Sequence, residues 1–158
     1  MSLRNLGHIC SHIQNCSRAR RPMAAVQHTK LHLAVAVGLY RHGMISHVQL
    51  GNTDGPDEVP VEITNENIAQ RMIWLTFKYH DTDPVLQSAK LLSKPSKVVT
   101  AKLDRLRKLV KGIRCADIKG LEPSDLLFVR TDKGVLEARE ALELGRGGQL
   151  LCRFTTLR

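Results

Sequence analysis

Histidine is the residue type in this chain whose spacing most resembles a chemical site. His8 and His12 lie one helical turn apart, and His28 and His32 repeat that spacing. A zinc site normally recruits four nitrogen or sulfur ligands at characteristic spacing, and no such cluster accompanies these pairs. We therefore expect no metal and no other cofactor, and interpret the histidines as solvated side chains on polar helix faces.

Cysteine is the second reactive type. Cys10, Cys16, Cys115 and Cys152 form no C-x-x-C pair, and no secretory apolar segment starts the chain. Disulfide scaffolds belong to small secreted domains with regular cysteine spacing. We expect reduced thiols, mostly in the core.

Catalytic motifs are not visible either. Gly145-Arg-Gly-Gly148 lacks the Gly-Lys-Ser/Thr of a phosphate-binding P-loop, and neither G-x-S-x-G nor H-E-x-x-H occurs. Glu137, Glu140 and Glu143 are evenly spaced along one helical segment, which is typical of a solvated face. The sequence predicts a protein that is not an enzyme and has no small-molecule substrate.

The first half of the chain predicts helices and strands in the order αβαββ. Leu3, Leu6, Ile9 and Ile13 recur at helical spacing. Thr29 can cap a second helix that ends at His42-Gly43. The strands expected here are 23–26, 45–50 and 72–79, with turns at 51–58 and 81–84.

The second half predicts a β-rich unit with short helices. Strands are expected at 87–92, 97–101, 126–131 and 149–155, with a basic loop at 93–96 and a tight turn at 132–134. Helices are expected at 103–113 and 137–144. The fold class is therefore α+β in two small subdomains, residues 1–85 and 86–158.

Net charge points to an anionic partner. The 158 residues carry 24 Lys and Arg against 15 Asp and Glu, a formal charge of +9. Residues 1–53 hold six basic and no acidic residues, and residues 90–119 hold ten basic against two acidic. Residues 54–89 between them hold two basic and seven acidic. Such clustering is typical of proteins that neutralise phosphates, although a merely solvated surface is the alternative.

Membrane association is the less favoured interpretation of the same charge. The longest apolar run, residues 31–40, has half the length needed to span a bilayer. The basic helix near residues 102–111 could lie on a membrane surface or face phosphate, and its short length and lack of aromatic anchors disfavour the membrane. We expect no membrane partner.

Short motifs of the second half occur in a specific order. They are Leu92-Ser-Lys-Pro-Ser96, Val129-Arg-Thr-Asp-Lys-Gly-Val-Leu136, Ala138-Arg-Glu-Ala141 and Gly147-Gly-Gln-Leu-Leu-Cys152. Together they resemble the universal small-subunit ribosomal protein eight family, which has a Val-Ser-Arg/Lys-Pro-Gly loop, a Ser-Thr-Ser-Lys-Gly-Val-Met turn, an Arg-Glu-Ala helix and a Gly-Gly-Glu strand. In the first half, Ile13-Gln-Asn15, Thr29-Lys-Leu31 and Leu39-Tyr-Arg-His-Gly-Met-Ile45 are similar to the family's Ile-Arg-Asn, Ser-Lys-Leu and Leu-Lys-Glu-Glu-Gly-Phe-Ile. The likeness covers nearly the whole chain, except an acidic insertion near 51–68 and an extra segment near 114–125.

This resemblance implies a non-catalytic protein that binds the central domain of small-subunit rRNA and supports subunit assembly and translation. Its partners would be that rRNA and neighbouring small-subunit ribosomal proteins, with the second subdomain as the RNA-binding unit. Irregular RNA helices are read through shape, 2′-hydroxyl and phosphate contacts. The rRNA-binding residues implied are Lys30, Ser93, Lys94, Ser96, Lys97, Arg130, Thr131, Asp132, Lys133, Gly134, Gly147, Gly148 and Gln149.

The chain departs from the family pattern within this set. Arg130-Thr131-Asp132 stands where the family has Ser-Thr-Ser, Gln149 replaces a glutamate, and Thr100 stands where an aromatic residue is frequent. Asp132 either turns back to cap the local turn or accepts a hydrogen bond from an exposed base amine. The sequence does not choose between these two roles.

The acid-free N-terminal block resembles mitochondrial targeting segments. Together with the divergent motifs and the insertions, it favours the mitochondrial form of the family over a cytoplasmic or bacterial-type ribosome. The hypothesis from another class is a free basic RNA-binding protein or an RNA-processing enzyme outside the ribosome.

Overall fold

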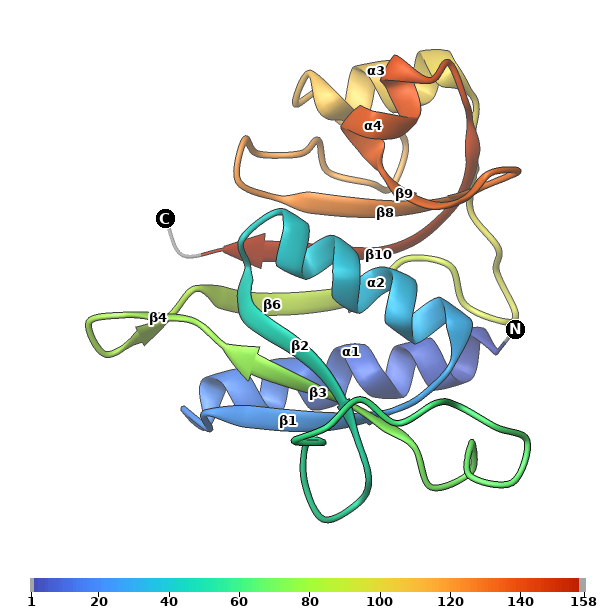
Figure 1. The fold of residues 1–158 in the computed structure, drawn as a ribbon. Coiled ribbons are helices and arrows are strands. Elements are labelled where there is room, and N and C mark those ends of the chain that lie inside the picture. The colour runs from blue at the N-terminus through green and yellow to red at the C-terminus, as the bar shows by residue number, and fades with distance from the viewer. Residues whose placement is uncertain (1, 157–158) are drawn as a thin grey trace. The chain divides into compact units, whose positions relative to one another are not determined.

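The computed structural model describes residues 2–156, which form two compact units. Residues 12–87 make one unit, and residues 88–156 make the other together with residues 2–11. Both combine helices with antiparallel strands (Figure 1). The predicted α+β fold class is confirmed.

Helix α1, Leu3–Arg18, has the apolar stripe that its sequence predicts. Leu6, Ile9 and Ile13 are buried, while Arg4 and His12 on the opposite side are exposed. Burying one face is what stabilises a helix of this length, because its intrinsic propensity alone is marginal.

The sheet of the unit 12–87 consists of β1 (Met23–Gln27), β3 (Met72–Phe77) and β2 (Ile45–Gly51), in that spatial order. Helix α2, Lys30–Arg41, connects β1 to β2. The hydroxyl of Thr29 accepts from the His32 backbone N–H at 3.1 Å, so the predicted cap forms. Strand β3 alternates between half-buried and buried residues, which directs Ile73, Leu75 and Phe77 into the core.

The strand predicted at 72–79 is wrong at its end. Strand β3 stops at Phe77, and Tyr79–His80 form the separate strand β4, which pairs with β5, Asp83–Pro84. The hydroxyl of Tyr79 donates to the Arg21 carbonyl at 2.5 Å. The turn predicted at 81–84 is shorter: residues 81–82 connect the two strands of this small hairpin, with Asp81 at a φ of 55°.

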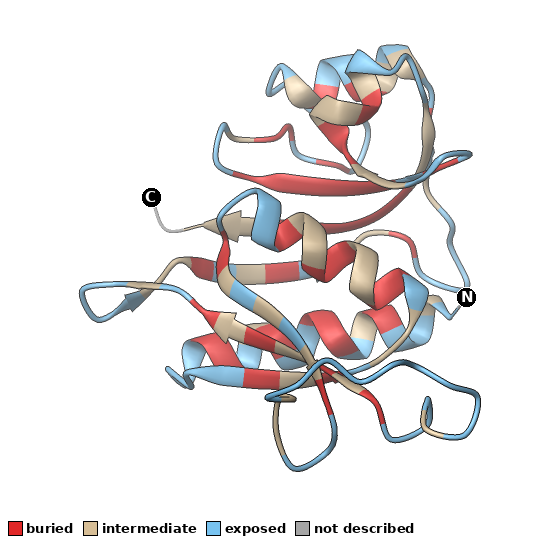
Figure 2. Cartoon of the chain, viewed as in Figure 1, coloured by how far each residue is buried: buried red, intermediate tan, exposed pale blue. Residues whose placement is uncertain are grey.

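The acidic connection between β2 and β3 is mostly exposed (Figure 2). It is attached to the sheet by Arg71, whose buried guanidinium lies 2.5 Å from Asp57 Oδ2 and donates to Asn52 Oδ1 at 3.1 Å. The indole N–H of Trp74 donates to the Asn52 carbonyl at 2.9 Å. Trp74 is half-buried, and Phe77 is buried in the core.

The sheet of the other unit has the order β6–β10–β8–β9, and β7 pairs with the start of β10. The bounds are β6 Leu86–Leu91, β7 Thr100–Ala101, β8 Leu126–Thr131, β9 Gly134–Glu137 and β10 Gly148–Thr156. Helices α3, Leu103–Val110, and α4, Ala138–Glu143, contribute Leu106, Leu109 and Ala141 to a core with Val129 and Leu150. The long buried stretches of β8 and β10 are visible in Figure 2.

Several predicted boundaries in this unit need correction. The strand expected at 97–101 is reduced to Thr100–Ala101, because Lys97 pairs back to Lys94 within the loop. Helix α3 ends at Val110 rather than 113, and Ile113 is 52% exposed. Strand β9 was not predicted, and Glu137 is the N-cap of α4 rather than its first residue.

Cysteine thiols lie where the sequence predicts. Cys10, Cys16 and Cys152 are buried, Cys115 is half-buried, and all are free. Burial raises the pKa of the Cys152 thiol well above 9.0, and the neighbouring Cys10 adds to this increase. Cys152 is therefore an inert core thiol.

Two further features concern metals and membranes. Among residues 2–156, no group of three or more His, Cys, Asp or Glu side chains is arranged to hold a metal ion. Within the same range, no helix has the length and apolar character needed to cross a bilayer.

Candidate nucleic-acid interface

A row of paired residues crosses the sheet of the unit 88–156. Thr100 on β7 pairs with Gln149 on β10, Gln149 pairs with Arg130 on β8, and Arg130 pairs with Val135 on β9. Directly paired residues of antiparallel strands place their side chains on the same face. Arg130 is exposed between buried neighbours in β8. The row therefore presents a hydroxyl, an amide and a guanidinium side by side, and we call these three residues the polar row.

The turn after β8 is closed by Thr131. Its hydroxyl donates to the Gly134 carbonyl at 3.0 Å and accepts from the Lys133 backbone N–H at 3.3 Å. Thr131 is 9% exposed, so this hydroxyl serves the turn. Gly134 has a φ of 118°, a conformation that residues other than glycine rarely adopt. Lys133 is exposed at the tip of the turn.

Asp132 does not cap the turn, and its hydrogen bond from an exposed base amine stays a prediction. Its Oδ2 accepts from Arg146 Nη1 at 2.9 Å, while Thr131 caps the turn. Both partners are largely exposed. The pair brings an opposite charge to the carboxylate, which reduces its repulsion of a nearby phosphate.

Gly147 and Gly148 lie where strands approach too closely for a side chain. A Cβ at Gly148 would lie 2.1 Å from the Arg130 carbonyl oxygen, and one at Gly147 would lie 2.7 Å from that of Ala101. Both of these neighbours are backbone atoms, which cannot move aside like a flexible side chain. These glycines therefore allow β10 to pair with β7 and β8, and so align the polar row.

The basic loop that follows β6 is anchored by Ser93. This residue is fully buried; its single O–H can donate to the carbonyl of Leu150 or of Val99, and its oxygen accepts from the Val99 N–H at 3.0 Å. Because the hydroxyl is hydrogen-bonded in the interior, the role of Ser93 is to hold the loop in place. The backbones of Lys94 and Lys97 exchange two hydrogen bonds of 3.0 Å.

The predicted loop residues Lys94, Ser96 and Lys97 are exposed. Lys94, Lys97 and Thr100 line one shallow depression, so the loop lies next to the polar row. Lys97 also lies 3.6 Å from Asp117 across exposed surface, a weak interaction in water. Lys30, the remaining predicted residue, is exposed at the start of α2 in the unit 12–87.

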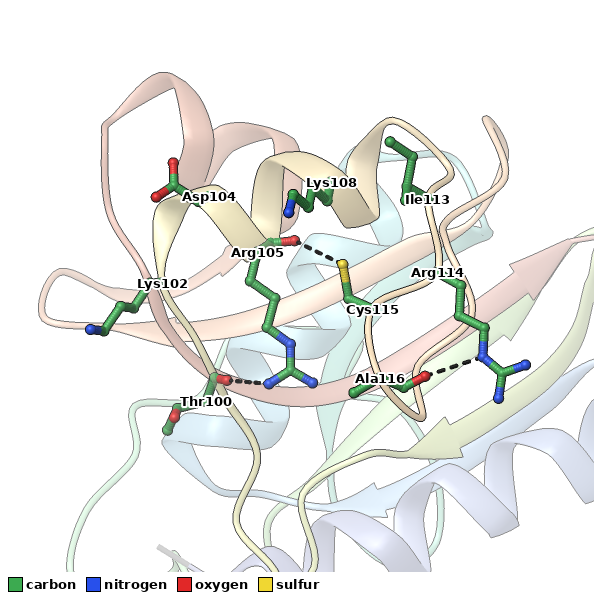
Figure 3. Close-up of a pocket in the computed structure, with 9 residues that line it drawn as sticks. All are labelled: Thr100, Lys102, Asp104, Arg105, Lys108, Ile113, Arg114, Cys115 and Ala116. Atoms are coloured by element: carbon green, nitrogen blue, oxygen red, sulfur yellow. Dashed lines mark hydrogen bonds between the residues drawn. The ribbon is translucent and has the colours of Figure 1, made fainter.

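Four basic residues beside this surface are not among the predicted rRNA-binding residues. Lys102, Arg105, Lys108 and Arg114 line a second depression, of about 730 Å³, with Thr100 at its edge (Figure 3). Thr100 and Arg105 border both depressions. The excess of basic residues at 90–119 indicated an anion-binding region, but a charge count does not show which of these residues share one face.

Comparison with known proteins identifies the family. The family model described as ribosomal protein S8 matches residues 5–154. The chain belongs to the ribosomal protein S8 family. The matched range contains the polar row, the basic loop and the turn after β8, and the predicted resemblance is confirmed.

Individual relatives of this S8-family chain include fungal and bacterial proteins. The small ribosomal subunit protein uS8m of Neurospora crassa is 40% identical over 97% of this chain and 99% of its own length. The protein of the same name from Schizosaccharomyces pombe is 35% identical over 94% of this chain and 97% of its own length. The small ribosomal subunit protein uS8 of Gluconacetobacter diazotrophicus is 30% identical over 94% of each chain.

Proposed function

We propose that this S8-family chain is a structural constituent of the mitochondrial small ribosomal subunit. Both fungal relatives carry the mitochondrial designation uS8m and match nearly the full length of the chain. The role is structural rather than catalytic, as is usual for the family. Its partners are small-subunit rRNA and neighbouring ribosomal proteins of the subunit.

The polar row is the observation that carries the proposed binding site. A-form RNA offers a shallow groove lined with 2′-hydroxyls and phosphates, which polar side chains on the exposed face of a sheet can contact. Gln149 and Thr100 supply neutral donors and acceptors, and Arg130 supplies a planar cation beside them. We assign the interaction with the central domain of the rRNA to this row, in the subdomain predicted at residues 86–158.

The other predicted residues divide into two roles in this proposal. Lys94, Lys97 and Lys133 supply exposed positive charge next to the row, and Ser96 and Gly134 allow close backbone approach. Ser93, Thr131, Gly147 and Gly148 position the loop, the turn and the strands. Asp132 affects RNA binding through its ion pair with Arg146. Lys30 belongs to the first subdomain and contacts RNA there, apart from the polar row.

Binding to a transcript of the rRNA central domain tests the site. Arg130→Gln and Lys94→Gln should each weaken binding and reduce the slope of log K against log salt by about 0.7–0.9 for each phosphate that is no longer neutralised. Lys78→Gln, an exposed lysine of the other unit, is the matched control. Slopes equal to the control in both variants would contradict the assigned surface.

Sedimentation separates the ribosomal role from a free RNA-binding protein or RNA-processing enzyme. A tagged chain should co-sediment with the small subunit of mitochondrial extracts and stay bound in high salt. Complete release in mild salt would contradict the ribosomal role. Accumulation of the tagged chain in the cytosol would contradict the mitochondrial location.

A further inference from the structure

The depression beside α3 is a charged groove built mainly from two segments. One wall is α3 with the residue before it, carrying Lys102, Arg105 and Lys108, and the other is the segment 113–116 with Arg114. Asp104 is the one acidic residue among the nine that line it. Asp104 Oδ1 lies 3.7 Å from Arg107 on the same helix. The groove therefore carries an excess of positive charge.

The two arginines of the groove are oriented by backbone carbonyls. Arg105 Nη1 donates to the Thr100 carbonyl at 3.1 Å, and Arg114 Nε donates to the Ala116 carbonyl at 3.1 Å. Figure 3 shows Arg105 descending from α3 and Arg114 lying on the far side of Cys115 and Ala116. A guanidinium has five N–H donors, and each of these two hydrogen bonds uses one of them. The guanidinium groups are thus held in place and can still donate to an anion.

The second wall of the groove is anchored rather than loose. Cys115 and Ile118 exchange two backbone hydrogen bonds, of 3.0 and 3.1 Å, and the Ile113 N–H donates to the Lys108 carbonyl at 3.0 Å. Gly120 packs directly on Gly112, where a Cβ would lie 2.0 Å from the carbonyl oxygen.

A buried arginine fixes the rest of the same segment. Arg153 Nε donates to Asp125 Oδ2 at 3.1 Å, and its other nitrogens donate to the carbonyls of Lys119 and Gly120 at 2.9 and 3.1 Å. Both Arg153 and Asp125 are buried. Ordering the segment in the free protein lowers the entropy cost of ligand binding at its surface.

We propose that this groove binds the sugar-phosphate backbone of the RNA strand that continues from the polar row. Thr100 belongs to both the row and the groove wall, so one strand can touch Gln149 and Arg130 and then reach Arg105 and Arg114. Phosphate is an anion that guanidinium groups recognise well, through charge and several N–H donors. The proposal rests on the proposed function and assigns part of the RNA binding to the extra segment at 114–125.

Salt dependence of binding tests this groove separately from the row. The double variant Arg105→Gln/Arg114→Gln should reduce the slope with the central-domain transcript by about 1.4–1.8, because two phosphates are no longer neutralised. The control Arg107→Gln/Lys111→Gln removes the same charge from the end of the same helix, at residues that do not line the groove. Circular dichroism checks that both double variants fold.

The outcomes distinguish the two proposals. If the groove variant matches the Arg107→Gln/Lys111→Gln control while Arg130→Gln still reduces the slope, the groove proposal is overturned and the row stands. If the wild-type chain does not bind the transcript above the level of an unrelated RNA, the proposed function itself fails.

Cys115 gives a second, independent readout. Its half-buried thiol lines the groove, whereas Cys10, Cys16 and Cys152 are buried. N-ethylmaleimide should therefore label Cys115 first in the native chain, and saturating transcript should slow that labelling about tenfold or more. Mass spectrometry with Cys115→Ser as the reference identifies the site.

Two results of the labelling experiment would contradict the proposal. Unchanged labelling at saturating transcript would mean that RNA does not cover the groove. Equal protection by vesicles of phosphatidylserine and phosphatidylcholine would identify a general anion site, with a membrane surface as the competing occupant.

Discussion

At the scale of single residues, the chain compensates charge where its sequence departs from the S8 pattern. The hydroxyl of Thr131 closes the turn, and Asp132 is left to pair with Arg146 at 2.9 Å. An exposed ion pair of this kind contributes little to stability, about 0–1 kcal/mol. Its larger effect is expected on RNA binding, because Asp132 lies two residues beyond Arg130 of the polar row.

Asp132→Asn distinguishes the roles of this carboxylate. If Asp132 only opposes Arg146, removing its charge should tighten binding of the central-domain transcript by about two- to fivefold, the range of a surface ion pair. Filter binding at low salt measures this change, with the exposed Asp81→Asn as the control for net charge. Weaker binding of Asp132→Asn would instead indicate that Asp132 accepts a hydrogen bond from a base amine.

At the scale of elements, the close pairing of β10 with its neighbours determines whether the polar row exists. Gly148→Ala would place a Cβ 2.1 Å from the Arg130 carbonyl oxygen, so the strands must separate. We expect the free energy of unfolding to fall by about 2 kcal/mol or more, as for other overpacked backbone sites. Urea denaturation measures this change.

Gly55→Ala is the matched control for the Gly148 variant. Nothing lies within 4 Å of a Cβ at Gly55, and its φ is not in the left-handed region, so we expect a change within about 0.5 kcal/mol. Equal stability of the two variants would contradict the close approach of β10 and β8.

At the scale of the whole molecule, one buried histidine links folding to pH. The prediction of solvated histidines is wrong for His32, which is 3% exposed and whose Nδ1 donates to the Gln27 carbonyl at 2.9 Å. Burial lowers the pKa of His32 below its ordinary value of 6.5; the Gln27 hydrogen bond raises it, and the nearby His28 lowers it again. The folded state therefore binds fewer protons than the unfolded state just below pH 6.5.

Acid should consequently destabilise the folded chain. The free energy of unfolding should be fully retained above pH 6.5 and should decrease as pH falls below it, because protons favour the unfolded state there. His32→Asn keeps a donor for Gln27 and removes the titrating group. Urea denaturation between pH 7.5 and 5.5 should show a shallower pH slope for this variant, and identical slopes would contradict the burial effect.

Much of the fold could be predicted from the sequence because local patterns report on local structure. The stripe of α1, the Thr29 cap and the alternation in β3 each follow from the spacing of apolar and capping residues. Strand β9 was missed because its four residues are defined by pairing with β8 rather than by a pattern of their own. Lys97 was assigned to a strand, but its backbone pairs with that of Lys94 within the loop, and this pairing is not visible in the local sequence.

By itself, the sequence determined the family, the α+β class and the excess of positive charge, since motif order and composition are properties of the chain. Only the tertiary structure decided which polar groups share a surface. Pairing across β7, β10 and β8 brings Thr100, Gln149 and Arg130 together, and packing of the extra segment places Arg114 in the same groove as Arg105. Such combinations of residues from separate segments depend on strand register and close backbone approach, which no local pattern encodes.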